Sequence, residues 1–452
     1  MNGYRQILAA IASIALKAKN NPDFALAVSL SYGLMGLQVL LQIFLMPLYL
    51  GAFDGYRFGA LMMLISYVGI VLPLATALYS VVLRLFGEAE VSGNPARFGA
   101  LYYAGRIAFL TIGLACGVGL LIVEVGHPVL FDDAAPDIRS ELIVTMLLSI
   151  LHLLLMCDIA VAQALLAASH RQTAVSLVIL TGLMAFALSV VPVLLLDGSL
   201  VEVMLCFIVG DIVSRVFATF CIRRLPLRPI RPSWPKLVTA LRGIVAAQAW
   251  RHFSLTLISA VLQADVIIVG LLGGPLAAAS FVLVWKIAEL LILLLSRVTW
   301  HLQVEFVRMD LREQGDRLLR VYNNTYAALL AGALVCALAY GLLGHWVVGL
   351  WVGAEAVPDE SWAYPLAGAS VLFLAMARLP ITVALSLNRV TLVVYLVTIE
   401  MIAKLLLIYL LFDEYGILAP LIAISVTHLC GLAYGYYAMG RHLVMRPLIP
   451  GA

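Results

Sequence analysis

Residues 251–297 decide the fold, and they read RHFSLTLISAVLQADVIIVGLLGGPLAAASFVLVWKIAELLILLLSR. Two long apolar segments flank a Gly-Gly-Pro turn at 273–275. Apolar segments of this length span a lipid bilayer, where an uncompensated charge is costly, so charges inside them are candidates for a functional role. The charged residues within these two segments are Asp265, Lys286, Glu289 and Arg297.

Composition places the whole chain in the membrane. Of its 452 residues, 63% are hydrophobic and 12% are charged, whereas a soluble globular protein carries about 25% charged residues. The six cysteines lie in or beside apolar segments without CxxC spacing, which indicates buried small side chains rather than disulfides or a metal site. The sequence has no P-loop, GxSxG or HExxH motif, so it predicts neither an enzyme nor a bound cofactor or metal.

The apolar segments form two sets of six, which predicts an all-α polytopic membrane protein with 12 transmembrane helices in two lobes. The N-terminal lobe, residues 21–222, holds spans at 24–50, 58–80, 102–124, 140–168, 173–196 and 201–222. The C-terminal lobe, residues 249–440, holds spans at 249–271, 278–300, 322–347, 361–387, 391–412 and 416–440. An amphipathic helix on the membrane surface is predicted at 1–20, and a cytoplasmic tail at 441–452.

A basic, proline-rich linker separates the lobes at residues 223–248. It is too polar to cross the membrane, and beside a bilayer its basic side chains are expected to contact anionic lipid headgroups rather than nucleic acid. Most of the 28 Lys and Arg residues lie in loops on the linker's side, against Arg57 and Arg139 on the other side. Because basic loops stay in the cytoplasm, we expect a multi-pass inner-membrane protein with both termini cytoplasmic.

Short matches between the lobes indicate an internal repeat. Leu50-Gly51 before the second span corresponds to Leu272-Gly273 before the eighth, and His170-Arg171 corresponds to Asn388-Arg389. Since each lobe has an even number of spans, both cross the membrane in the same sense, which predicts a pseudo-twofold axis along the membrane normal. Many transporters build alternating access from paired repeats of this kind.

Two charge pairs inside spans are predicted to be structural. Asp211 and Arg215 lie four residues apart, as do Glu400 and Lys404, so each pair can be neutralised on one helix face.

Asp158 and Asp265 have no such partner on their own span. Each is predicted either to pair with a basic residue on a neighbouring span or to carry a coupling proton or ion. His152, six residues before Asp158, lies off its face and is predicted to be a satisfied polar group.

Basic residues in the C-terminal lobe suggest a path for an anion. Lys286 and Arg297 are eleven residues apart, about three helical turns, so they project along one stripe. Lys286 can also pair with Glu289, whereas Arg297 has no carboxylate three or four residues away. A stripe of positive charge along a span suits the passage of an anionic headgroup. Arg378 is a further site candidate, and Arg251, near a span end, is expected to reach the lipid headgroups.

Three motifs carry a resemblance to a transporter family. They are Leu48-Tyr49-Leu50-Gly51 with Gly55-Tyr56 and Gly59, then Asp265 through Leu272-Gly273 with Lys286-Ile287, and Asp413-Glu414-Tyr415-Gly416-Ile417. In these motifs, in span count and in loop lengths, the chain resembles the polysaccharide transporters. These are the O-antigen-type, lipid-linked oligosaccharide flippases of the multidrug/oligosaccharidyl-lipid/polysaccharide (MOP) exporter superfamily.

The resemblance implies two pseudo-symmetric six-helix lobes, as in MATE transporters, around a V-shaped cavity. It implies that an undecaprenyl-diphosphate-linked sugar repeat moves to the outer leaflet for surface polysaccharide synthesis, with a polysaccharide polymerase and a chain-length regulator as partners. Carried onto this chain, the substrate-binding residues would be Lys286, Glu289, Arg297 and Arg378, and Asp265 and Asp158 would serve ion or proton coupling.

Two alternatives stay open. A cation-coupled exporter of drugs or metabolites from the same superfamily would favour acidic cavity residues, because its typical substrates are cations. The basic residues without a local partner, Arg251, Arg297 and Arg378, favour an anionic substrate instead. A polytopic enzyme of the polysaccharide pathway would need a large outer loop for its catalytic site, and the sequence has none.

Overall fold

The structure is a computed structural model that describes residues 22–126, 136–246, 261, 264–311, 314–387, 389–429, 437, 440 and 441. The predicted surface helix at 1–20, the tail after Arg441 and most of the predicted span at 249–271 lie outside these residues. Within the described ranges every regular element is a helix, and nine helices are long and apolar enough to cross a membrane. The predicted all-α, polytopic membrane architecture is therefore confirmed.

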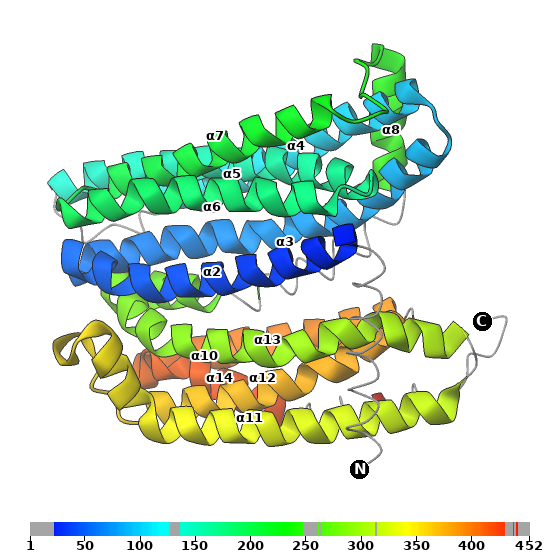
Figure 1. Ribbon diagram of the computed structural model, residues 1–452. Coiled ribbons are helices and arrows are strands. Elements are labelled where there is room, and N and C mark those ends of the chain that lie inside the picture. The colour runs from blue at the N-terminus through cyan, green and yellow to red at the C-terminus, as the bar shows by residue number, and fades with distance from the viewer. Residues whose placement is uncertain are drawn as a thin grey trace. The chain divides into compact units, whose positions relative to one another are not determined.

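Two compact units make up the described chain, and they divide between Ile267 and Ile268. The N-terminal unit contains α2 (Pro22–Ala52), α3 (Gly55–Val91), α4 (Pro95–Gly126), α5 (Pro136–Ala168), α6 (Gln172–Leu195), α7 (Leu200–Arg223) and α8 (Trp234–Ala246). The C-terminal unit contains α10 (Asp265–Leu311), which begins just before the boundary, α11 (Gly315–Val352), the 3-10 turn η1 (Ala354–Ala356), α12 (Ala363–Ser386), α13 (Val390–Tyr415) and α14 (Leu418–Thr427). Both units are bundles of long helices (Figure 1).

The N-terminal unit packs its long helices side by side around an aromatic core. Phe86, Phe98 and Phe109 are fully buried where α3, α4 and α5 meet. Between α6 and α7 the contact depends on small residues: a Cβ added at Gly182 would lie 1.9 Å from the Ser214 hydroxyl oxygen. Helices in a bilayer associate mainly through van der Waals contacts of this kind, because the surrounding lipid is as apolar as the side chains and the hydrophobic effect does not favour their association.

The basic linker is attached to the N-terminal unit. Its α8 lies across one end of the bundle and packs against α4 (Figure 1). Leu225 and Ile244 are buried in the same core, and the Ile230 carbonyl oxygen occupies space that a Cβ at Gly99 would need. The basic side chains of the linker stay exposed: Arg223, Arg224, Arg228, Arg231, Lys236 and Arg242. Contact of these side chains with anionic headgroups stays a prediction.

The predicted turns appear where their residues lie. His170, between α5 and α6, and Asp197, between α6 and α7, adopt positive φ of 56° and 53°, and these reverse the chain. At the second turn Ser199 caps α7 and forms a capping box with Glu202. Backbone N–H groups at the start of α7 therefore find hydrogen-bond acceptors within the turn itself.

The C-terminal unit contains the Gly-Gly-Pro turn as a kink inside α10. Gly274 has φ 79° and ψ 176° there, which interrupts the helical backbone between two helical stretches. Pro275 then starts the second stretch, where a missing backbone N–H costs nothing. Further along, α11 and α12 pack closely, since a Cβ at Gly368 would lie 2.4 Å from the Ala337 carbonyl oxygen.

Candidate functional site

Three charged residues from three helices meet inside the N-terminal unit. Asp158 on α5 accepts from Arg106 on α4 through Nε at 2.5 Å and Nη2 at 3.1 Å. It also accepts from Nε of Arg215 on α7. The Asp158 side chain is 10% exposed, so its carboxylate is buried with both oxygens occupied. Charge-assisted, two-pronged contacts of this kind are among the strongest hydrogen bonds in proteins.

The two arginines differ in how fully they are engaged. Arg215 donates its remaining nitrogens to the Thr219 hydroxyl and the Tyr102 hydroxyl, each at 3.2 Å. Arg106 lies 5.9 Å from the Tyr102 ring centre, and its Nη1 has no partner among the described residues. Its side chain is 33% exposed. With two guanidinium groups and one carboxylate, the cluster carries a net charge of +1, and Arg106 is the group that can donate further.

The predicted Asp211–Arg215 pair is wrong. Asp211 on α7 instead contacts Nδ1 of His152 on α5 at 2.5 Å, while Arg215 donates a hydrogen bond to Asp158. The reason lies in the packing of the helices. Because α5 packs directly against α7, both side chains meet partners inside this buried contact, where hydrogen bonds are stronger than in water.

Two sequence predictions for α5 are answered by these contacts. Of the two alternatives for Asp158, pairing with basic residues on neighbouring spans is the one observed. His152 was predicted to be a satisfied polar group, and the structure satisfies its Nδ1 through Asp211, while its ring packs on Phe207 with centroids 5.1 Å apart.

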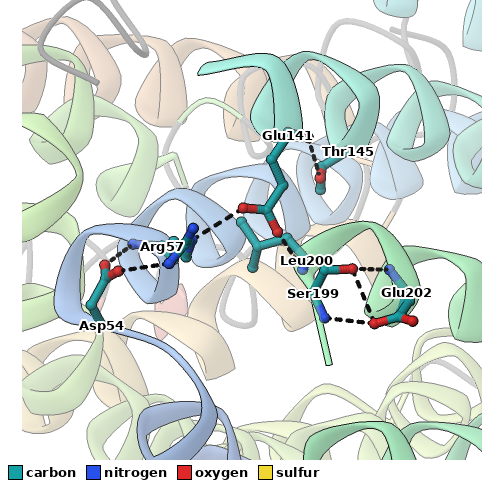
Figure 2. Close-up of polar contacts among 7 residues, drawn as sticks. All are labelled: Asp54, Arg57, Glu141, Thr145, Ser199, Leu200 and Glu202. Atoms are coloured by element: carbon teal, nitrogen blue, oxygen red, sulfur yellow. Dashed lines mark hydrogen bonds and ion pairs between the residues drawn. The ribbon is translucent and has the colours of Figure 1, made fainter. Parts of the chain in front are cut away.

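A second polar network ties the ends of three helices together (Figure 2). Arg57 at the start of α3 donates through Nε to Glu141 of α5 at 3.1 Å and pairs with Asp54 at 3.3 Å. The other Glu141 oxygen accepts from the backbone N–H of Leu200, the first residue of α7, at 2.9 Å. One carboxylate therefore joins α3, α5 and α7 at this end of the bundle.

Replacing Glu141 with alanine is expected to destabilise the protein by about 1–3 kcal/mol, because the buried Leu200 N–H then loses its acceptor. Glu141→Gln is the matched variant, since its amide oxygen can still accept from Leu200. Thermal unfolding in detergent should place Glu141→Gln between wild type and Glu141→Ala. Equal losses in both variants would mean that the pair with Arg57 accounts for the effect.

The C-terminal unit brings together only some of the predicted site residues. Lys286 pairs with Glu289 on α10 at 2.9 Å, as their spacing predicts. Asp265, at the start of α10, is buried, and Arg378 on α12 is exposed. Arg251 and the side chain of Arg297 lie outside the described structure. The proposed stripe from Lys286 to Arg297 thus stays a prediction.

A buried ionisable cluster on α13 includes a residue that the sequence did not single out. Glu400 and Lys404 are 4% and 3% exposed. His428, just after α14, contacts Glu400 through Nε2 at 2.5 Å, and its Nδ1 lies 2.9 Å from the Ile424 carbonyl oxygen. Both ring nitrogens of His428 therefore lie within hydrogen-bond distance of a polar group, Nε2 at Glu400 and Nδ1 at the Ile424 carbonyl and the Thr427 hydroxyl.

Residues that sequence reasoning missed share one feature, which is that their partners are distant in sequence. Arg106 meets Asp158, Tyr102 meets Arg215 and His428 meets Glu400, and none of these charged partners lies at helical spacing. An intramembrane arginine such as Arg106 is itself a signal, because charge inside a span is costly. Among the described residues no group of three His, Cys, Asp or Glu side chains is placed to hold a metal ion.

No family model and no curated protein sequence matches this chain. Several solved structures are similar to it. A multidrug resistance MATE family transporter of the MOP superfamily, in its inward-facing conformation, aligns with TM-score 0.73 and 13% identity over 90% of this chain and 94% of its own. The outward-facing conformation of such a transporter gives TM-score 0.61 at 13% identity, covering 94% of this chain and 96% of that one.

A third similar structure is a MOP superfamily transporter from Pyrococcus furiosus, described as having a binding pocket of reverse polarity that suggests a different function. It aligns with TM-score 0.58 and 14% identity over 94% of this chain and 96% of its own. At these identities the similarity establishes the fold. The chain is a polytopic membrane protein with the fold of MATE transporters.

Proposed function

We propose that this protein is a membrane exporter that moves an anionic, lipid-linked oligosaccharide from the inner to the outer leaflet by alternating access. The substrate class we infer is a polyprenyl-diphosphate-linked sugar repeat for a surface polysaccharide. The MATE-like fold supports the transporter part of the proposal. The Arg106–Asp158–Arg215 cluster supports the anionic substrate.

The charge of that cluster is the observation that carries the proposal. Asp158, which would be needed to attract a cation, is already occupied by two arginines, and Asp211 is occupied by His152. The group left with donor capacity is Arg106. A guanidinium fork matches the oxygens of a phosphate, so Arg106 suits a diphosphate better than a protonated drug.

In the C-terminal unit the proposal assigns Lys286, Arg297 and Arg378 to the diphosphate and to acidic sugars, with Glu289 holding Lys286 in place. Asp265 is the candidate for ion or proton coupling. Differential binding of the substrate to the inward and outward states would then drive the exchange between them. The exporter would act in the inner membrane beside a polysaccharide polymerase and a chain-length regulator.

The competing function is a cation-coupled multidrug exporter, which the described function of the MATE neighbours favours. The Pyrococcus furiosus neighbour, described by reverse polarity of its pocket and a different function, supports a broader range of substrates for this fold. The experiment must therefore distinguish an anionic lipid-linked substrate from a cationic drug.

The test is a clean deletion strain complemented with wild type, with Arg106→Ala, or with the control Arg84→Ala, whose side chain is 83% exposed. We expect the deletion to lose surface polymer and to accumulate lipid-linked repeat units on the inner leaflet. Arg106→Ala should restore at most a tenth of the polymer, while Arg84→Ala restores it fully, at matched amounts of folded protein. Arg106→Ala removes the free donor but leaves Asp158 paired with Arg215.

Normal polymer in the deletion strain, together with new sensitivity to toxic cations, would establish the drug exporter instead. Full complementation by Arg106→Ala would contradict the role of Arg106 in binding an anionic substrate, even if the protein is a flippase. Reversing the charges of Lys286 and Arg297 together tests the C-terminal stripe in the same assay, and unchanged export would contradict that assignment.

A further inference from the structure

A small cavity inside the N-terminal unit lies apart from the Arg106–Asp158–Arg215 cluster. Its volume is about 190 Å³, and it lies between α3, α5 and α7. Its walls are mainly apolar, formed by Val68 and Gly69 of α3, Met156 of α5, and Met204 and Phe207 of α7. Nothing in the proposed transport mechanism uses this space.

Among the described residues that line the cavity, one side chain, that of His152, is polar. His152 lines it while remaining 8% exposed. Its Nδ1 is held by Asp211, and its Nε2 has no partner among the residues that the structure describes. His152 lines the cavity, and Nε2 is the ring nitrogen that its contact with Asp211 leaves available. A buried polar atom of this kind seeks a hydrogen bond from whatever occupies the space.

The role of Nε2 depends on where the shared proton lies. When the Asp211 carboxylate accepts from Nδ1–H, the neutral ring leaves Nε2 as an acceptor. When Asp211 or the ring carries an additional proton, Nε2–H becomes a donor. A hydroxyl group satisfies both cases, because it can donate and accept.

Size and wall chemistry limit the rest of the ligand. The volume is somewhat larger than the cavity of about 150 Å³ that binds benzene in an engineered protein. It therefore fits one six-membered ring with a few further atoms. Methionine side chains adapt to a ring and make favourable sulfur–aromatic contacts, and Met156 and Met204 supply two of them here.

We propose that this cavity is a binding site for a small, neutral, aromatic alcohol whose hydroxyl group bonds to Nε2 of His152. The ring would fill the space between α3, α5 and α7 and stabilise their packing. The proposal stands independently of the transport substrate, because none of its residues belongs to the proposed anion path.

Gly69 offers a way to fill the cavity without disturbing its walls. It lines the cavity, and a Cβ added there meets no atom within 4 Å. Gly69→Leu should thus occupy the ligand's space while leaving the bundle intact. Gly119→Leu on α4 is the matched control, because Gly119 also has open space at its Cβ and does not line the cavity.

The experiment measures binding of four probes to the purified full-length protein in detergent, by equilibrium dialysis and by thermal shift. The probes are 4-methylphenol, toluene, benzylamine and benzoate. We expect 4-methylphenol to bind at least tenfold more tightly than the other three. Gly69→Leu should abolish this binding, and Gly119→Leu should leave it unchanged. His152→Phe should remove the preference for 4-methylphenol over toluene.

Several results would overturn the proposal. Tighter binding of benzylamine would show a cation site created by Asp211, and unchanged binding in Gly69→Leu would place the ligand elsewhere. If Gly69→Leu fails to fold, Met156→Ala serves instead, because enlarging the cavity should shift preference from 4-methylphenol to 2-naphthol by at least tenfold. An unchanged preference there, or equal binding of all probes, would rule the site out.

Discussion

Asp158→Ala is expected to destabilise the folded protein by about 3–5 kcal/mol, because it leaves the largely buried Arg215 and the partly buried Arg106 without their carboxylate. Arg215 is the more affected, since its side chain is 18% exposed and its other contacts are neutral hydroxyls. Thermal unfolding in detergent and the yield of monodisperse protein measure the loss. The surface residue Asp413 is the control, because its replacement by alanine removes an exposed carboxylate.

A triple variant separates stability from function in the same cluster. Replacing Arg106, Asp158 and Arg215 together with leucine removes every charge, and apolar replacements of buried ion networks are often neutral or stabilising. We expect this variant to regain most of the stability lost in Asp158→Ala while failing to restore surface polymer. An Asp158→Ala protein as stable as wild type would show that the cluster is hydrated rather than buried.

Gly182→Leu is the second change with a large expected effect. A Cβ there would lie 1.9 Å from the Ser214 hydroxyl oxygen and 2.9 Å from the Gly210 carbonyl oxygen. Because one of these atoms is backbone, α6 and α7 must separate, and overpacking a core costs about 1–3 kcal/mol or more. We expect loss of monodisperse protein, which fluorescence-detected size-exclusion chromatography measures.

The matched control is Gly87→Leu on α3, because a Cβ at Gly87 meets no atom within 4 Å. Both substitutions add the same side chain to a helix, so the difference between them isolates the α6–α7 contact. Adding Ser214→Ala to Gly182→Leu removes the nearest clashing atom and should recover part of the yield. No recovery would mean that the Gly210 backbone sets the limit.

Local signals explain which features of the fold could be predicted. Helices followed from apolar runs of membrane-spanning length, and the turns near His170, Asp197 and Gly274 followed from polar or glycine residues between those runs. The Lys286–Glu289 pair also followed, because residues three apart on a helix meet whatever the surroundings.

The same rule of spacing failed for Asp211 and Arg215. Both are four residues apart on α7, yet each is bound by a residue of α5. Spacing along a helix says which side chains can meet, but burial against a neighbouring helix decides which contact is stronger. The linker illustrates the same point, because its composition predicted only a segment outside the membrane, whereas the Ile230 backbone lies against Gly99 and Ile244 is buried in the core of the bundle.

The sequence by itself determined that this is an all-helical membrane protein, where its main turns lie, and that charge is present inside its spans. These properties depend on hydropathy and on residues within a few positions of each other. Tertiary structure alone decided the charge of the interior, because Asp158 meets Arg106 and Arg215 across 52 and 57 residues of chain. It alone decided the cavity beside His152, since a void exists only between helices that have packed.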